Sequence, residues 1–336
     1  MPDIIRIAFD DLFQKIEQIM QKVGFAPERA KLIAQVLTEN SCDGIASHGY
    51  NRVLFLADSV QRGKVNINAS PQLVAQFGAW EQWDGQLGPG ITNALACTDR
   101  AMELAREHGI GCVALRNTNH WLRPGKYGWR AAEAGFAFIC WTNTIPNMPP
   151  WGGAEPRIGN NPIVLAVPCD TGPVVLDMAM SQFAFGQLEL YRLRDRPLPV
   201  PGGYDAQGQL TTDAGAIIES KRPLPIGYWK GSGLSLMLDL LGTLMSGGRS
   251  TFQLGQQSHE YGVSQVYLAI DLSRVASQTV IDQIVTNTLD SLRSAALAED
   301  SEAIRYPGEH ILATRQENLA NGIPVDREIW EAIQEF

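Results

Sequence analysis

The sequence predicts a mixed α/β protein, and three observations lead to this class. Apolar residues recur every three or four positions through the first 65 residues, which is typical of amphipathic helices. After Pro71, short runs rich in Val, Ile and aromatic residues alternate with helical segments, as expected for a mixed sheet. Residues 280–292 and 307–336 are helical again by pattern, and we expect them to pack on the N-terminal helices.

The N-terminal part reads as three helices with short links. The first spans about residues 9–23 and ends before Gly24, and the second opens at Pro27, a favoured first-turn residue. The third runs from about 48 to 61, with Ser47 placed as its N-cap.

The middle of the chain supplies the strands. A helix at about 91–107 ends at Gly109, and an almost wholly apolar helix at 234–245 is predicted to be either central or buried in a subunit contact. Residues 193–227 read as a long irregular excursion. We expect a helical domain of residues 1–70 joined by 275–336, and a sheet domain of residues 71–274. The predicted strands are 72–77, 79–83, 112–115, 136–141, 163–167, 174–176 and 266–270.

Composition excludes several classes of protein. The net charge is −9, with 27 Lys and Arg against 36 Asp and Glu, and no basic block is dense enough for a nucleic-acid partner. The longest apolar run, 134–141, is too short for a membrane span. The start lacks the pattern of a secretory signal. Five cysteines without CxxC spacing indicate reduced thiols in a cytoplasmic protein, and no residue set has metal-ligand spacing.

The standard dinucleotide fingerprint is absent. One match to GxGxxG/A exists, at residues 109–114, but it follows a helix and precedes a strand, whereas the fingerprint requires the reverse. Gly109 is better explained as the residue after a helix. A nicotinamide cofactor, if bound, therefore does not use the Gly-rich turn.

The first polar cluster is residues 47–52. On a helix beginning near 47, His48 and Arg52 share one face. Reduction of a 2-keto acid needs such a pair, because Arg grips a carboxylate through two hydrogen bonds and His protonates the ketone oxygen. The alternative is an ordinary capped surface helix.

Two further clusters and one acid add candidates. Residues 116–125, with His120, follow a predicted strand, where α/β sheets place ligands, although an Asn-rich turn explains them equally well. Residues 227–233 precede the apolar helix and would offer free N–H groups to an anion such as a pyrophosphate, to a sulfate, or to nothing. Asp177 follows an apolar strand and needs a cationic or N–H partner, with His48 as one candidate.

In these clusters and in several other motifs, the chain resembles the malate/L-lactate dehydrogenase family of NAD(P)-dependent oxidoreductases. The resemblance runs in register from about residue 8 to the C-terminus. It is carried by Ser47-His48-Gly49 with Arg52, Asn119-His120-Trp121, residues 143–151 (NTIPNMPPW), residues 157–162 (RIGNNP), residues 176–181 (LDMAMS), residues 227–233 (GYWKGSG) and residues 305–309 (RYPGE).

The resemblance implies a non-Rossmann fold with a largely antiparallel sheet, a helical domain from both chain ends, and a cytoplasmic homodimer. It further implies reduction of a 2-keto sugar acid, with NADH preferred and NADPH possible. His48 matches the proton donor, Asp177 the residue that orients it, and Arg52 a substrate-binding position, while His120 is expected to contact substrate. The cofactor positions are Pro173, Val174, Val175, Leu176, Asp177, Met178, Ala179, Trp229, Lys230, Gly308, Glu309 and His310.

Two alternatives remain open at this point. The same scaffold could act on malate, lactate, ureidoglycolate, sulfolactate or a cyclic imino acid. The chain could also be a non-catalytic protein that binds a nucleotide or sugar acid. Residues 308–310 read Gly-Glu-His where the sugar-acid branch has Gly-His-Glu, which leaves the roles of Glu309 and His310 open.

Overall fold

The computed structural model describes residues 3–299 and 301–336. Its helices are α1 (Phe9–Lys22), α2 (Pro27–Cys42), α3 (Val53–Gln61), α4 (Gly90–His108), α5 (Gly125–Glu133), α6 (Phe185–Leu193), α7 (Ala214–Ser220), α8 (Trp229–Ser246), α9 (Thr251–Leu254), α10 (Gln278–Arg293), α11 (Glu309–Asn321) and α12 (Arg327–Glu335). Its strands are β1 (Ile4–Ile7), β2 (Gln72–Phe77), β3 (Trp80–Asp84), β4 (Ile110–Thr118), β5 (Phe136–Thr142), β6 (Ile163–Val167), β7 (Val174–Met178), β8 (Gly203–Tyr204), β9 (Leu210–Thr211), β10 (Val263–Asp271) and β11 (Ile323–Asp326).

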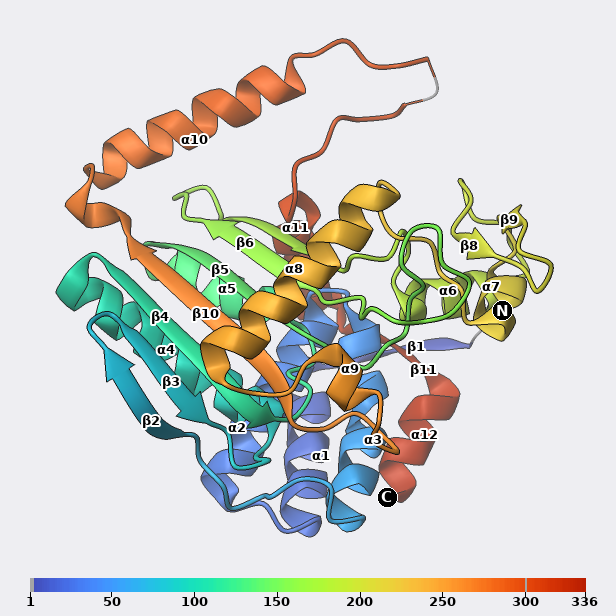
Figure 1. Ribbon diagram of the computed structural model, residues 1–336, viewed down its shortest axis with the longest axis horizontal. Helices are drawn as coiled ribbons and strands as arrows, with labels where there is room; N and C mark the ends of the chain where they lie inside the picture. Colours follow the sequence, from blue (N-terminus) through green and yellow to red (C-terminus); the bar gives the residue numbers. More distant parts are fainter. Residues whose placement is uncertain (1–2, 300) are drawn as a thin grey trace.

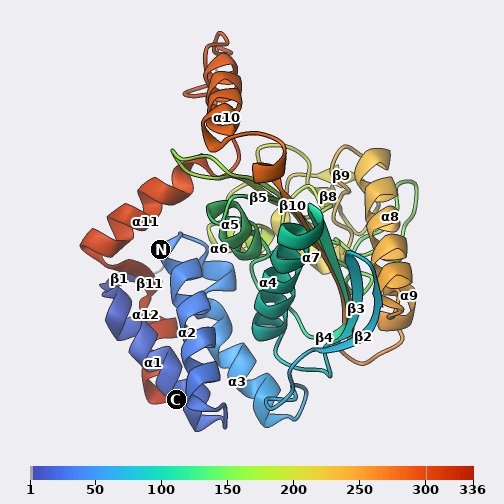
Figure 2. The same ribbon diagram turned by 90° about the vertical axis from the view of Figure 1, so that its left-hand side faces the viewer.

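A seven-stranded sheet forms the centre of the molecule. Its order is β2-β3-β4-β10-β5-β6-β7, and only the β3–β4 pair is parallel. Helices α4 and α5 pack on one face and α8 on the other (Figures 1 and 2). The predicted mixed, largely antiparallel sheet is confirmed, and so is the role of Gly109, which ends α4 at a φ of 88°.

Both ends of the chain meet beside the sheet. Strand β1 pairs antiparallel with β11, and α1 and α2 lie against α12 and α11 (Figure 2). One continuous buried cluster joins this helical part to the sheet, running from Leu12 and Ile33 to Val113 and Phe138. The division into domains at residues 70/71 and 274/275 therefore stays a prediction. Among the described residues, no helix has both the length and the apolar character that a membrane crossing demands.

The predicted third helix is wrong in its first turn. Ala46–His48 and Tyr50–Arg52 form two 3₁₀ turns, and α3 begins only at Val53. Gly49 lies between the two turns. Only glycine fits at this position, because a Cβ there would lie 2.3 Å from Ser41 Oγ. His48 and Arg52 therefore do not share a helical face, and Ser47 caps no helix.

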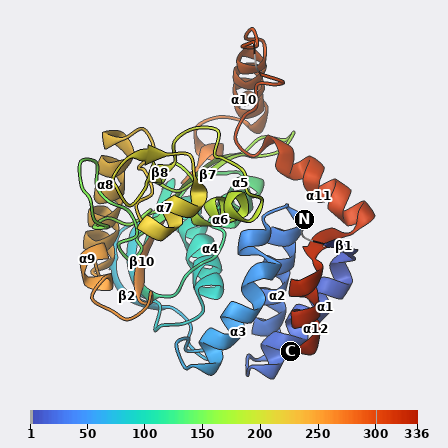
Figure 3. The same ribbon diagram turned by 90° about the vertical axis from the view of Figure 1, so that its right-hand side faces the viewer.

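Two other segments differ from expectation. Residues 307–336 return to the N-terminal helices, but α10 stands away from the body of the molecule and buries only Ile281 (Figures 1 and 3). Residues 193–227 are not irregular throughout. With α6 they form a small unit of α7, β8 and β9, packed around Leu188, Leu198 and Ile217.

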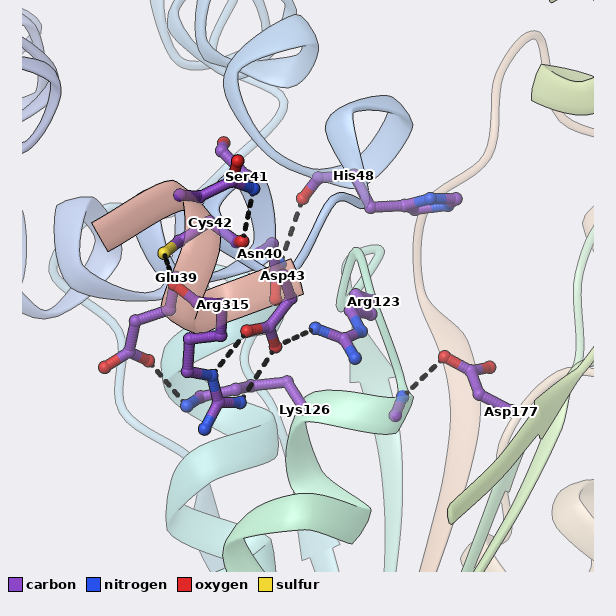
Figure 4. A network of polar contacts seen from close by, with 12 residues as sticks. Glu39, Asn40, Ser41, Cys42, Asp43, His48, Arg123, Lys126, Asp177 and Arg315 are labelled. Atoms are coloured by element: carbon purple, nitrogen blue, oxygen red, sulfur yellow. Dashed lines mark hydrogen bonds and ion pairs between the residues drawn. The ribbon is translucent and has the colours of Figure 1, made fainter. Parts of the chain in front are cut away.

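A buried carboxylate connects three distant parts of this architecture. Asp43 follows α2, and its side chain is only 1% exposed. Arg123, before α5, donates to Asp43 Oδ2 at 2.5 Å, and Arg315 of α11 donates to Oδ1 and Oδ2 at 2.6 and 3.0 Å (Figure 4). Although burial alone would raise the pKa of Asp43, the two guanidinium groups outweigh it and lower that pKa. Asp43 is therefore ionised and joins the N-terminal helices, the loop after β4 and the C-terminal helices.

We predict that Asp43→Asn destabilises the fold by about 3–5 kcal/mol, because it leaves two cations without their shared buried counter-charge. Urea unfolding followed by circular dichroism measures this loss. Asp58→Asn is the matched control, since it removes only the exposed Asp58–Arg62 pair on α3, worth about 0.3–0.5 kcal/mol. A loss of less than about 1 kcal/mol for Asp43→Asn would contradict this reading of the network.

Candidate active site

Two imidazole rings lie face to face at the centre of the candidate site. The ring centroids of His48 and His120 are 6.2 Å apart, with 16° between their planes. His48 ends the first 3₁₀ turn, where its carbonyl accepts from Asn40 Nδ2 at 3.0 Å. Its Nδ1 lies 3.0 Å from Ser47 Oγ. Ser47 thus engages one ring nitrogen and leaves Nε2 as the nitrogen available to a ligand.

The tautomer of His120 is set by the backbone. Leu122 N–H donates to His120 Nδ1 at 3.0 Å, so the neutral ring carries its proton on Nε2. Within the described residues, no hydrogen bond involves Nε2, and the His120 side chain lines a cavity of about 330 Å³. His120 is thereby suited to donate a hydrogen bond to a ligand oxygen.

Arg52 lines the same cavity. Its Nε donates to the Ser47 carbonyl at 2.9 Å, and its guanidinium lies 5.7 Å from the Phe55 ring centroid. The two terminal nitrogens make no hydrogen bond within the described part of the chain, so the outer edge of the fork can hold a carboxylate through two parallel bonds. The structure therefore brings Arg52 beside His120, although not through the helical spacing that the sequence suggested.

The surroundings of these rings are electropositive. Burial lowers the pKa of His48 to about 3, helped by His120, Arg52 and Arg123. Burial also lowers the pKa of His120 to about 4, and Arg52 adds to this effect. Both imidazoles are therefore neutral near pH 7 without a ligand, and a bound anion would offset the cationic repulsion that adds to the effect of burial.

Asp177 lies on the same side of Arg123 as the His48 ring (Figure 4). Its Oδ2 accepts from Gly125 N–H at 2.9 Å. A Cβ at position 125 would lie 2.6 Å from that oxygen, so this position requires glycine. Desolvation raises the Asp177 pKa, opposed by Arg123 and by the N–H group. The expected N–H partner is present, whereas no hydrogen bond joins Asp177 to His48.

Two of the segments assigned to the cofactor by resemblance contact opposite ends of the third, which contains β7. Val175 N–H donates to the Pro307 carbonyl at 3.2 Å, which brings residues 308–310 against residues 173–179. Ile226 N–H donates to the Met180 carbonyl at 2.8 Å, which places the start of α8 at the other end of β7. Gly125, next to the imidazole loop, contacts the same strand through Asp177.

One part of the anion-site expectation is wrong. The amides of Lys230, Gly231 and Ser232 donate to the carbonyls of Gly227, Ile226 and Tyr228, so they are not free for a pyrophosphate. The Trp229 side chain is 66% exposed, and the Lys230 side chain is also open to solvent. Any contact to a dinucleotide here would come from these side chains.

Glu309 has an unused acceptor. Its Oε1 pairs with Arg293 of α10, and Arg293 is the main reason why the Glu309 pKa is lowered. Its Oε2 is buried and has no partner among the described residues. A ribose hydroxyl is a donor of the kind this oxygen lacks, so Glu309 fits a contact to the ribose of a nicotinamide dinucleotide.

Sequence reasoning assigned no role to Asp43 or Arg123. Arg123 lies within the predicted cluster at 116–125, but nothing in its neighbours shows that it reaches a carboxylate 80 positions earlier. Asp43 reads as a polar residue after a helix. The one sequence feature that could have indicated them is that each lies beside a glycine, Gly44 or Gly125, and close to a candidate site residue.

Comparisons with known proteins agree with this arrangement. The family described as malate/L-lactate dehydrogenase matches residues 7–334. A protein named 2,3-diketo-L-gulonate reductase from Klebsiella pneumoniae is 44% identical over 331 residues, covering 98% of this chain and 99% of the relative.

Among solved structures, malate dehydrogenase from Pyrococcus horikoshii OT3 superposes with a TM-score of 0.88 at 29% identity, over 100% of this chain and 96% of that one. Sulfolactate dehydrogenase from Methanocaldococcus jannaschii gives a TM-score of 0.87 at 26% identity, over 98% and 96% of the two chains. Membership of a dehydrogenase family implies a nicotinamide cofactor. The chain belongs to the malate/L-lactate dehydrogenase family.

Proposed function

We propose that this protein reduces 2,3-diketo-L-gulonate to 3-dehydro-L-gulonate with NADH. The carrying observation is the convergence of Arg52, His120 and His48 on one site, because this set matches a carboxylate beside a ketone. The substrate assignment is supported by the 44% identity to a relative of that name over nearly the whole chain.

Arg52 holds the substrate carboxylate in this proposal. Its Nε is used by the Ser47 carbonyl, so the guanidinium presents its two terminal nitrogens in a fixed plane. A carboxylate held there lies next to the neutral imidazoles and cancels part of the positive potential around them. Binding of the substrate and protonation of a ring thus favour each other.

His48 supplies the proton to the oxygen on the 2-keto carbon. When bound, a reduced nicotinamide supplies the hydride to that carbon, and the carbonyl becomes a hydroxyl. Ser47 holds His48 Nδ1, and we assign Asp177 the orienting role that the resemblance implies, with Arg123 acting on the pKa of both residues. His120 donates from Nε2 to a substrate oxygen and keeps its own tautomer through Leu122.

The cofactor contacts are proposed to come from residues 173–179, from Trp229 and Lys230, and from residues 308–310. Glu309 favours NADH over NADPH, because its unpartnered Oε2 accepts from a ribose hydroxyl but repels a phosphate at the same place. His310 is exposed and follows Glu309 in the first turn of α11.

A homodimer is proposed from two exposed apolar features. Helix α8 packs on the sheet through Leu238, while its outer side exposes Leu236, Met237, Leu240, Leu241 and Leu244. Helix α10 extends beyond the body with Ile284 60% exposed (Figure 3). A second copy would cover both, since isolated soluble chains rarely expose such continuous apolar surface. A cytoplasmic location is supported by five cysteines that are all reduced and buried.

Other 2-keto acids remain candidates because the structural relatives include a malate and a sulfolactate dehydrogenase. Initial rates of NADH oxidation with 2,3-diketo-L-gulonate, pyruvate, oxaloacetate and sulfopyruvate separate these substrates. The proposal requires the diketo acid to have the highest kcat/KM.

We predict that His48→Gln lowers kcat by about 10²–10⁴-fold, the range typical of a lost general acid, while NADH binding stays nearly unchanged. Stopped-flow turnover and fluorescence titration of NADH measure the two effects. A variant retaining more than about a tenth of wild-type kcat would contradict the role of His48.

The pH profile follows from the sign of the His48 shift. Because the lowered pKa makes the free ring neutral, the acid form becomes rarer as pH rises, and kcat/KM for reduction should fall about tenfold per pH unit between about pH 6 and 8. Substrate binding should also take up a proton, detectable with a pH indicator in weak buffer. A flat profile together with no proton uptake would rule out His48 as the proton source.

Light scattering should give about twice the chain mass of 36.8 kDa. Leu244→Glu should lower that mass, because Leu244 is 74% exposed on the outer side of α8. Leu193→Glu at the end of α6 is the control, with a comparable exposure of 71%, and should leave the mass unchanged. A monomeric wild-type protein would refute the dimer.

A further inference from the structure

The cavity beside the imidazoles has walls of opposite charge. Arg52 and Lys64 are its cationic side chains, and Glu260, from the loop before β10, is its only carboxylate among the described residues. Apolar side chains and several uncharged polar ones, His120 among them, complete the lining. The remaining lining residues include Phe55, Leu56, Ser59, Val65, Ile91, Asn119, Leu122 and His259.

Glu260 is held in place with acceptor capacity to spare. Its Oε2 accepts from the Ile145 N–H at 3.1 Å, which fixes the carboxyl group against the loop after β5. Over the described ranges of the chain, Glu260 forms no ion pair and no second hydrogen bond. A carboxylate can accept about four hydrogen bonds, so Glu260 brings to the cavity it lines acceptor sites that no described residue uses.

Burial acts on Glu260 almost unopposed. It raises the pKa of the carboxyl group, and only the Ile145 N–H works in the opposite direction. A carboxyl group kept partly desolvated in a ligand cavity is suited to bind donors such as alcohol hydroxyls.

We infer that Glu260 forms the subsite for the hydroxylated tail of the substrate and selects it against a second carboxylate. This inference rests on the proposed function, which puts the substrate carboxylate on Arg52. The tail of a six-carbon diketo acid carries hydroxyls on its last three carbons, and these donors meet the free acceptor sites of Glu260. A dicarboxylate such as oxaloacetate would instead bring an acceptor-only group to Glu260, which contributes no positive charge in either protonation state.

Lys64 supplies the competing possibility. Its ammonium lines the same cavity and could pair with a second carboxylate. If Lys64 governed the tail site, oxaloacetate would be a good ligand of the wild-type protein, and removal of Glu260 would change little. The comparison of substrates below therefore decides between the two residues.

The experiment compares wild type with Glu260→Gln, using NADH and three 2-keto acids: 2,3-diketo-L-gulonate, pyruvate, which lacks a tail, and oxaloacetate. Each is measured as a substrate or, where turnover is slow, as a competitive inhibitor. We expect kcat/KM for the diketo acid to fall at least about tenfold, because a hydrogen bond to an ionisable acceptor is lost. Constants for pyruvate should stay within about twofold, and oxaloacetate should bind more tightly.

Glu335→Gln is the matched control, since it makes the same charge change at an exposed position at the end of α12. Equal losses for pyruvate and the diketo acid would assign Glu260 a merely structural role and overturn the inference. An unchanged ratio between the diketo acid and oxaloacetate would overturn it as well. If wild type failed to reduce the diketo acid at all, the proposed function itself would be wrong, which is a distinct result.

Discussion

Two guanidinium groups close on the buried carboxylate of Asp43, and the position of the candidate site depends on this contact. Arg123 is the nearer partner, and it lies in the loop that carries His120 on one side and Gly125 on the other. Fixing Arg123 therefore fixes both neighbours, one against His48 and one against Asp177. The same carboxylate holds Arg315, so the C-terminal helices share in placing the loop.

The charges around the site follow from this anchoring. Arg123 is neutralised by Asp43, yet it still lowers the pKa of His48, and Arg52 acts on both imidazoles. The site is therefore electropositive, and an anionic substrate brings the opposite charge. Glu260 adds an acceptor away from the reacting carbon, so the cavity distinguishes the two ends of a sugar acid.

Much of the fold could be predicted because its signals are local. Amphipathic spacing and the glycine after α4 predicted the helices, and runs of Val and Ile predicted the strands. The insertion of β10 between β4 and β5 could not be predicted, because strand order depends on distant pairing. The break at Gly49 depends on Ser41, and the partners of Asp43 lie on other elements, so neither has a local pattern. Residue types identified His48, Arg52 and Asp177, whereas Glu260 emerged only from the cavity it lines.

The pairing of β1 with β11 bears on how the molecule is made. During synthesis the first helices leave the ribosome long before residues 323–326 are made. Until then, the backbone groups of β1 that pair with β11 lack their partner. Arg315 reaches Asp43 equally late, and until then a buried carboxylate lacks one of its two cations. The N-terminal part of the nascent chain therefore cannot form the complete candidate site before the C-terminal helices are synthesised. A chain that stops before residue 315 would lack both the β1–β11 pair and the contact between Arg315 and Asp43.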